Sequence, residues 1–479
     1  MRPWLQRPNR SVFVAFTPLE RALIISLLLF FALFAFPFVI SSGSLTRLLM
    51  YVAFLAYLLT LSLPFLIKKF CPSLFHPLCF YVLWVGIQGL LRGQLILPIS
   101  GLEYHNALGT HHASYFDILI AFSFFLDSIG LLFFYIGYIF FPKIKVRTLS
   151  IPSTKWLFFK VSIWVGIAGF GLLALATIGG GLDQVLMQRG IASDQRISSQ
   201  VGGHWAFLAG LGVVAPMVWL ACEPNVIRKK IFWIILIITL MIKFASTGSR
   251  GGTITPLIFI GAIFILQNKK IPYREIVIGA FIALLIIGAG GQFRKATMQN
   301  SSLGEVEIES GISDWIISAV EEMQTQGGSN SGQLAVLGNV PNNESYLLGE
   351  SYLSVPFILL PRAIFGDKPD AGGRLLSTII YKNPLNTVPP SAVGEAFWNF
   401  SYFGVVFVFL IHGVILKIIS SIFFINSKHP LILILFVFFI FRFKLDSDSL
   451  YSLTHTIIPA IIIYVSFLKI KIKGLTFFK

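Results

Sequence analysis

Apolar segments of about 15 to 25 residues recur along this chain from one end to the other. Each segment is long enough to cross the roughly 30 Å hydrocarbon core of a bilayer as a helix, because a helix rises about 1.5 Å per residue. The 479-residue chain is 56% hydrophobic and only 12% charged, which leaves too few polar groups to cover a soluble globule of this length. The apolar runs lack the alternating polarity of barrel strands. The sequence therefore predicts an all-α integral membrane protein.

About twelve transmembrane helices are expected, and one long connection interrupts them. The expected spans are residues 21–40, 48–67, 77–97, 114–141, 156–178, 204–221, 231–245, 253–267, 275–291, 398–421, 430–442 and 453–468. The predicted organisation is a membrane bundle over 1–291, a large loop domain over 292–397, and the rest of the bundle with its tail over 398–479. Within the loop, Ser313 precedes an amphipathic pattern, which predicts a helix on the membrane surface or over a cleft.

The distribution of positive charge predicts the orientation of the chain. Lysines and arginines gather in the N-terminal tail, in alternate turns such as 68–69 and 228–230, and in the C-terminal tail. Short cytoplasmic loops carry an excess of Lys and Arg, so both termini are expected in the cytoplasm and the long loop on the outer side. The net charge of +16 is thereby explained by topology, and no nucleic-acid partner is expected.

A polar turn, Ser246-Thr247-Gly248-Ser249-Arg250-Gly251-Gly252, separates the seventh and eighth expected spans, and Arg250 is its only charge. The start of a helix offers unpaired N–H groups, and glycines let a ligand approach the backbone closely. The turn therefore predicts an anion site at the membrane surface. The alternative is a tight turn whose arginine extends to a lipid phosphate.

Further cations lie in the outer segments of the chain. Arg362 and Lys368 stand between two prolines in the long loop, and Arg442 opens the last outer turn. Arg189 and Arg196 lie among Ser, Asp and Gln in the loop after the fifth span, which suits either a sugar-lined rim or an ordinary exposed loop.

Arg92 lies inside the third expected span, and intramembrane charges are candidates for function. Asp117 and Asp127 of the fourth span are its natural partners, so a structural ion pair is the alternative.

The carboxylates of the outer segments are candidates for acid–base chemistry. Glu395 is placed at the outer mouth of the tenth span, where it is otherwise an interfacial carboxylate. Asp446 and Asp448 form an Asp-x-Asp, a pattern that holds a divalent metal in many glycosyltransferases but is common by chance. His and Glu residues in 103–112 match no metal-ligand spacing.

With these elements in order, the chain resembles the Wzy-type O-antigen polymerases, which are oligosaccharide repeat-unit polymerases of bacterial envelopes. The matching segments are residues 247–252, 361–369, 390–395 and 442–447. The resemblance implies a GT-C-like membrane glycosyltransferase with one large periplasmic loop domain. It also implies transfer of a growing glycan from undecaprenyl diphosphate to the non-reducing end of a lipid-linked repeat unit, at the periplasmic face of the inner membrane.

Such a reaction needs cations at the lipid diphosphate and a base for the acceptor hydroxyl. We expect Arg250, Arg362 and Arg442 to converge on the diphosphate, and Glu395 or Asp446 to act as the base. The expected substrate contacts are Arg189, Arg196, Lys368 and Arg92. No cofactor is expected, and a metal is redundant if three arginines neutralise the diphosphate.

Two other classes remain open at this point. An O-antigen ligase shares the helix bundle and large loop, but that group uses a histidine in the loop, and 292–397 contains none. A polysaccharide-lipid transporter or flippase more often shows two similar halves with a cytoplasmic link. A chain-length regulator and a flippase are possible partners of a polymerase.

Overall fold

The computed structural model describes residues 17–40, 44–67, 76–83, 113–151 and 154–181 apart from 143 and 145, 203–247, 250–268, 313–317, 331–357, 368–383 and 387–468, with a few isolated residues between them. Residues 313–317 are helical, in the segment where the sequence predicts a helix after Ser313. Within these ranges every regular element is helical, and the only pairing of strand type is a single bridge between Thr154 and Leu468.

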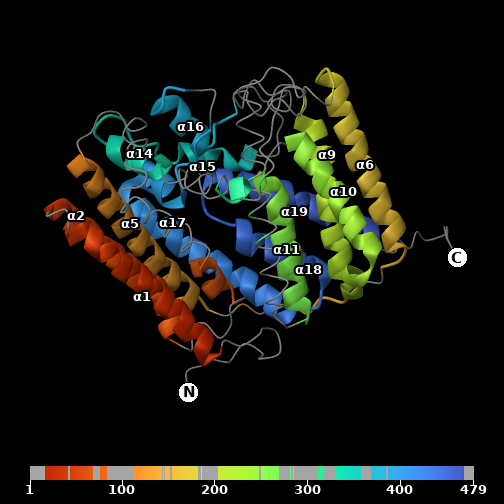
Figure 1. Cartoon of the computed structure of the whole chain (residues 1–479), viewed down its shortest axis with the longest axis horizontal. Helices are drawn as coiled ribbons and strands as arrows, with labels where there is room; N and C mark the ends of the chain where they lie inside the picture. The colour runs from red at the N-terminus through yellow and green to blue at the C-terminus, as the bar shows by residue number, and fades with distance from the viewer. Residues whose placement is uncertain are drawn as a thin grey trace. The chain divides into compact units, whose positions relative to one another are not determined.

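The helices have the following bounds: α1 Pro18–Ile40, α2 Leu45–Leu66, α5 Ala113–Phe140, α6 Leu157–Ile178, α9 Gly203–Cys222, α10 Lys230–Thr247, α11 Arg250–Asn268, α14 Ser331–Asn339, α15 Glu350–Leu353, α16 Gly372–Ile379, α17 Ala392–Ile425, α18 Pro430–Arg442 and α19 Ser447–Phe467, with the 3₁₀ turns η4 Pro224–Arg228 and η7 Val355–Phe357 (Figure 1). Six of the described helices are long and apolar enough to cross a membrane, and two shorter ones are also apolar. This agrees with a multi-pass helical membrane protein. The number twelve stays a prediction, because the third expected span is described only at 76–83 and most of the ninth lies outside the described residues.

The chain divides into two compact units, and the first comprises residues 1–145, 321–421 and 440–454. Its helix α1 packs along α2, and α2 packs along α5 (Figure 1). Helices α5 and α17 approach so closely that a Cβ added to Gly137 would meet the carbonyl of Leu410, and one added to Gly413 would meet the carbonyl of Phe134. Small residues allow this close backbone approach between membrane helices.

The second unit comprises residues 146–320, 422–439 and 455–479. Here α6 packs along α9, and α10 and α11 pack against α9 as well. Gly171 of α6 lies against the backbone of α9, and Gly212 of α9 lies against Ala168 of α6, so small residues line both sides of this crossing.

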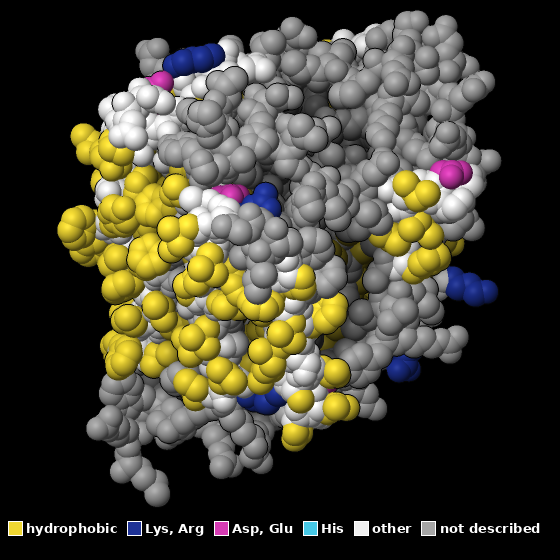
Figure 2. All heavy atoms as spheres, turned by 60° about the vertical axis from the view of Figure 1, so that its left-hand side comes forward, with side chains coloured by type: hydrophobic (Ala, Val, Ile, Leu, Met, Phe, Trp, Pro, Cys, Tyr) yellow, Lys and Arg dark blue, Asp and Glu magenta, His cyan; other side chains and the backbone are white. Residues whose placement is uncertain are grey.

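An extended hydrophobic surface covers α1 and α2. Figure 2 shows hydrophobic side chains over most of the described part of this face, with charged side chains above and below it. Leu33 of α1 is 70% exposed and Leu59 of α2 is 62% exposed. A surface of this kind is suited to contact with lipid tails.

Helix α17 differs from the span expected at 398–421, because it begins at Ala392. Ser391 caps this start: its Oγ accepts a hydrogen bond from Gly394 N at 3.1 Å. The helix is then interrupted at Phe400 and Ser401, whose backbone angles are not helical. The first part of α17 therefore forms a separate short helix that carries Glu395.

Candidate active site

Glu395 lies in the first turn of α17 and is completely buried. Its Oε1 accepts a hydrogen bond from Ser351 Oγ at 2.6 Å, and its Oε2 accepts one from Ser447 N at 3.0 Å. Ser351 belongs to α15 and Ser447 is the first residue of α19. Both oxygens of the buried carboxyl group are therefore held by donors from other segments of the chain, as a buried polar group requires.

Asp446 immediately precedes α19 and is 4% exposed. Its Oδ1 accepts a hydrogen bond from Ser449 N at 2.6 Å, which is the geometry of a helix N-cap. The backbone carbonyl of Asp446 also accepts from Leu450 N. The cap fixes the first turn of α19, and Ser447 N is thereby directed at Glu395.

The start of α16 completes the cluster. Gly372 N donates to Ser447 Oγ at 2.7 Å, and Gly373 N donates to Asp448 Oδ2 at 2.8 Å. A Cβ added to Gly372 would lie 2.9 Å from the Glu395 carboxyl group, and one added to Gly373 would lie 2.7 Å from Asp448 Oδ2. A side chain at either position would force the neighbouring carboxyl group to shift, since real Cβ atoms essentially never approach other atoms so closely.

Three helix starts, those of α16, α17 and α19, thus meet around three carboxyl groups. The N-terminal end of a helix carries unpaired N–H groups and a partial positive charge, which favours anionic side chains there. The arrangement explains how several acidic groups are accommodated with so little contact with water.

A second layer of hydrogen bonds lies behind Glu395. Asn399 Nδ2 donates to Ser351 Oγ and to the Glu395 carbonyl, both at 2.8 Å, and Asn399 Oδ1 accepts from Gly349 N at 2.9 Å. Asn399 and Ser351 are completely buried. The segment before α15 also pairs with the end of the short helix, where Leu347 N donates to Trp398 O.

Tyr352 borders the cluster and donates to the carbonyl of Leu445 at 3.3 Å. Burial raises the pKa of Tyr352 well above its ordinary value, and the nearby carboxylates of Glu395 and Asp446 raise it further. Tyr352 therefore stays protonated at neutral pH and acts as a hydrogen-bond donor.

Among the expected diphosphate ligands, Arg442 has a described side chain. It is half-buried at the end of α18, and its Nη1 donates to Ser452 Oγ of α19 at 2.9 Å. Arg250 is the first residue of α11, but its side chain lies outside the described part, as do Arg362, Arg189, Arg196 and Arg92. Lys368 is half-buried just before α16.

The two carboxylates expected as the base, Glu395 and Asp446, are brought together although they are distant in sequence. Sequence reasoning did not assign the residues that hold them, which are Ser351, Asn399 and Gly372. The available signal was weak: Gly372-Gly373 and Asp446-Ser447-Asp448 are short polar motifs that only the fold places side by side.

The two aspartates expected near Arg92 have other partners in the described part. Asp117 forms an ion pair with Arg47 at 3.5 Å, and Asp127 Oδ1 accepts a hydrogen bond from Gln333 Nε2 at 3.1 Å. Across the residues described here, no group of three or more His, Cys, Asp and Glu side chains is placed to hold a metal ion.

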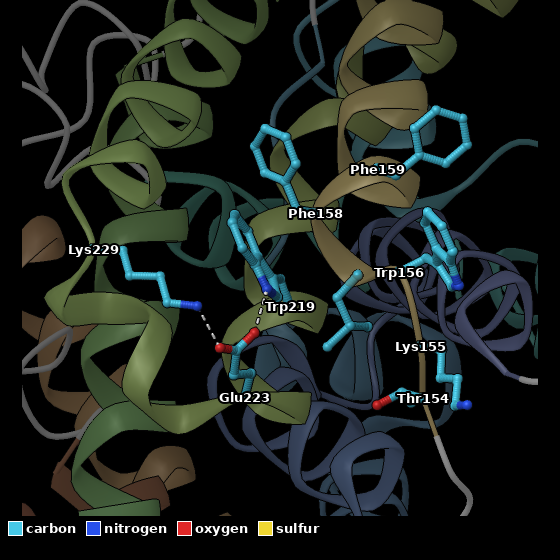
Figure 3. A pocket seen from close by; sticks show the side chains of 9 residues that line it. Thr154, Lys155, Trp156, Phe158, Phe159, Trp219, Glu223 and Lys229 are labelled. Carbon is cyan, nitrogen blue, oxygen red and sulfur yellow. Dashed lines mark hydrogen bonds and ion pairs between the residues drawn. The ribbon is translucent and has the colours of Figure 1, made fainter.

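A hollow of about 440 Å³ lies in the second unit, at the start of α6 and the end of α9 (Figure 3). Aromatic side chains such as Trp156 and Phe158 form much of its wall. Its carboxylate, Glu223, accepts hydrogen bonds from Trp219 Nε1 at 3.1 Å and from Lys229 Nζ at 2.6 Å, so its charge is already compensated. We assign no reaction to this hollow.

The fold is that of a multi-pass helical membrane protein, and its buried carboxyl cluster lies where the starts of α16, α17 and α19 meet. The family model described as O-antigen polysaccharide polymerase Wzy matches residues 22–476, which is nearly the whole chain. The chain therefore belongs to this family of glycosyltransferase-type polymerases, which act on lipid-linked oligosaccharides in a membrane. No curated protein and no solved structure matched the chain.

Proposed function

We propose that this protein transfers a growing glycan from undecaprenyl diphosphate to the non-reducing-end sugar of a newly delivered lipid-linked repeat unit. In this proposal the membrane is the inner membrane, both termini are cytoplasmic, and 292–397 forms a periplasmic loop domain in a GT-C-like bundle of twelve spans. The observation that carries the proposal is the buried Glu395, held by two donors in a chain of the polymerase family.

The proposed reaction is a displacement at the anomeric carbon of the donor glycan. Glu395 takes the proton of the acceptor hydroxyl, and the acceptor oxygen forms a bond to that carbon. The bond from the carbon to the diphosphate oxygen breaks, and its electron pair leaves with the lipid diphosphate. A carboxylate has about four acceptor positions, and Ser351 and Ser447 occupy two of them. Because Glu395 is completely buried in this structure, the proposal requires the residues around it to move before the acceptor hydroxyl can reach a remaining position.

The leaving diphosphate gains negative charge in the transition state, and fixed cations stabilise this charge most effectively in a water-excluded site. We propose that Arg250, Arg362 and Arg442 supply these cations, because a guanidinium grips phosphate oxygens in a bidentate manner. Lys368, Arg189, Arg196 and Arg92 are proposed as further substrate contacts. With these cations the reaction is proposed to need no metal.

The proposal is tested in cells by the lipid-linked intermediates that accumulate when the gene is deleted and then complemented. We expect one-repeat material on lipid after deletion, full-length polymer with the parent gene, and one-repeat material again with Glu395→Gln at normal protein level. Full-length polymer stranded on lipid after deletion would instead indicate a ligase, and would overturn the proposal. A chain-length regulator and a flippase are the partners proposed for the same cells.

A further inference from the structure

The hydrogen bonds around Asn399 and Ser351 have a fixed direction. Gly349 N is a donor only and the Glu395 carbonyl is an acceptor only, so the Asn399 amide has one orientation that satisfies both. In that orientation Asn399 Nδ2 also donates to Ser351 Oγ. A serine hydroxyl has a single hydrogen, and because one of its lone pairs accepts from Asn399, this hydrogen is available for Glu395 Oε1 at 2.6 Å.

Asn399 and Ser351 join two parts of the chain that are distant in sequence. Asn399 is the last residue before the interruption of α17 at Phe400 and Ser401. Ser351 belongs to α15, which lies within the region expected to form the outer loop. Trp398 adds two hydrogen bonds between the same two parts of the chain, since its carbonyl accepts from Leu347 N and its Nε1 donates to Ser345 O at 3.2 Å.

We propose that Asn399 and Ser351 are positioning residues for the transfer reaction, which act in series to hold the Glu395 carboxylate in the orientation that accepts the proton of the acceptor hydroxyl. The inference rests on the proposed function, in which Glu395 is the base. A base must lie within hydrogen-bond reach of the proton that it removes, so a fixed carboxylate orientation contributes directly to the rate. Segment 345–351 thereby becomes part of the active site although none of its side chains needs to touch substrate.

The test uses the purified full-length protein and measures kcat and KM with lipid-linked repeat units. Ser351→Ala removes a hydrogen bond to a charged group, so we expect kcat to fall roughly ten- to a hundredfold with little change in KM. Asn399→Asp keeps the oxygen that accepts from Gly349 N but puts a second oxygen in place of the Nδ2 donor. This oxygen draws the Ser351 hydrogen away from Glu395, so we expect a similar fall in kcat. Ser354→Ala is the matched control, because Ser354 Oγ donates only to the nearby carbonyl of Ser351 at 2.7 Å.

A double-mutant cycle separates positioning from a general structural role. If Ser351 acts through Glu395, adding Ser351→Ala to Glu395→Gln should change the residual rate less than twofold, since neighbouring residues that act as one unit are not additive. Full activity of Ser351→Ala and Asn399→Asp beside a strongly impaired Glu395→Gln would overturn this inference alone. Equal losses in the parent and Glu395→Gln backgrounds would show a structural role and also overturn it. Full activity of Glu395→Gln would instead overturn the proposed function.

Discussion

At the scale of single residues, the site is determined by which atoms donate to each carboxyl group. Glu395 receives donors on both oxygens, whereas Asp446 uses one oxygen to cap α19. The sequence identified both residues as carboxylates near the outer ends of expected spans. It did not reveal that Glu395 lies against the start of α19, the helix that Asp446 caps, because the hydrogen bond from Ser447 N to Glu395 joins segments that are distant in sequence.

The cap on α19 leads to a prediction about Asp446. Asn is as good a helix N-cap as Asp, whereas Ala is not, and loss of a cap costs about 1 kcal/mol. We therefore expect Asp446→Asn to keep most of the transfer activity and Asp446→Ala to lower the melting temperature of the purified protein. Activity assays and thermal melts of both variants make the comparison. An inactive but normally stable Asp446→Asn would show that Asp446, and not Glu395 alone, takes part in the proton transfer.

At the scale of helices, most expected spans correspond to described helices. A long apolar segment in a bilayer forms a helix because the helix pairs all of its backbone N–H and C=O groups within the segment. The expected span at 398–421 matches the second part of α17, whereas the short helix that begins at Ala392 is not predicted. Pro389, Pro390 and the polar Glu395 resemble a loop approaching the membrane. The missed signal was Ser391, a good N-cap residue directly before the helix. The interruption at Phe400 has no comparable signal in the sequence, and the residues directly before it contact segment 345–351, which is distant in sequence.

Helix packing in the first unit leads to a prediction about Gly137. A methyl group at this position would meet the backbone carbonyl of Leu410 in α17, which cannot move without displacing the helix. Overpacking of this kind costs roughly 1–3 kcal/mol, so Gly137→Ala should melt at a lower temperature than the parent. Gly169→Ala in α6 is the matched control, because no atom of the described residues lies within 4 Å of the added methyl group. Equal melting temperatures for Gly137→Ala and the control would contradict the close crossing of α5 and α17.

At the scale of the whole molecule, composition and charge distribution were enough to predict a multi-pass helical membrane protein, and the order of weak motifs was enough to predict its family. The family match over 22–476 confirms that second prediction. The convergence of Arg250, Arg362 and Arg442 on a diphosphate stays a prediction, because no local pattern places three separate outer segments relative to one another. Sidedness likewise stays a prediction from the distribution of Lys and Arg.

We propose that this chain alone transfers glycan between lipid-linked units, with Glu395 as the base and without a metal. The most direct measurement is the product pattern of the purified protein given one lipid-diphosphate repeat unit, with and without excess EDTA. We predict a ladder of products one repeat apart under both conditions, and only a slow residual transfer with Glu395→Gln. An absence of products with the parent protein, or a ladder that disappears in EDTA and returns with added Mg²⁺, would contradict this account.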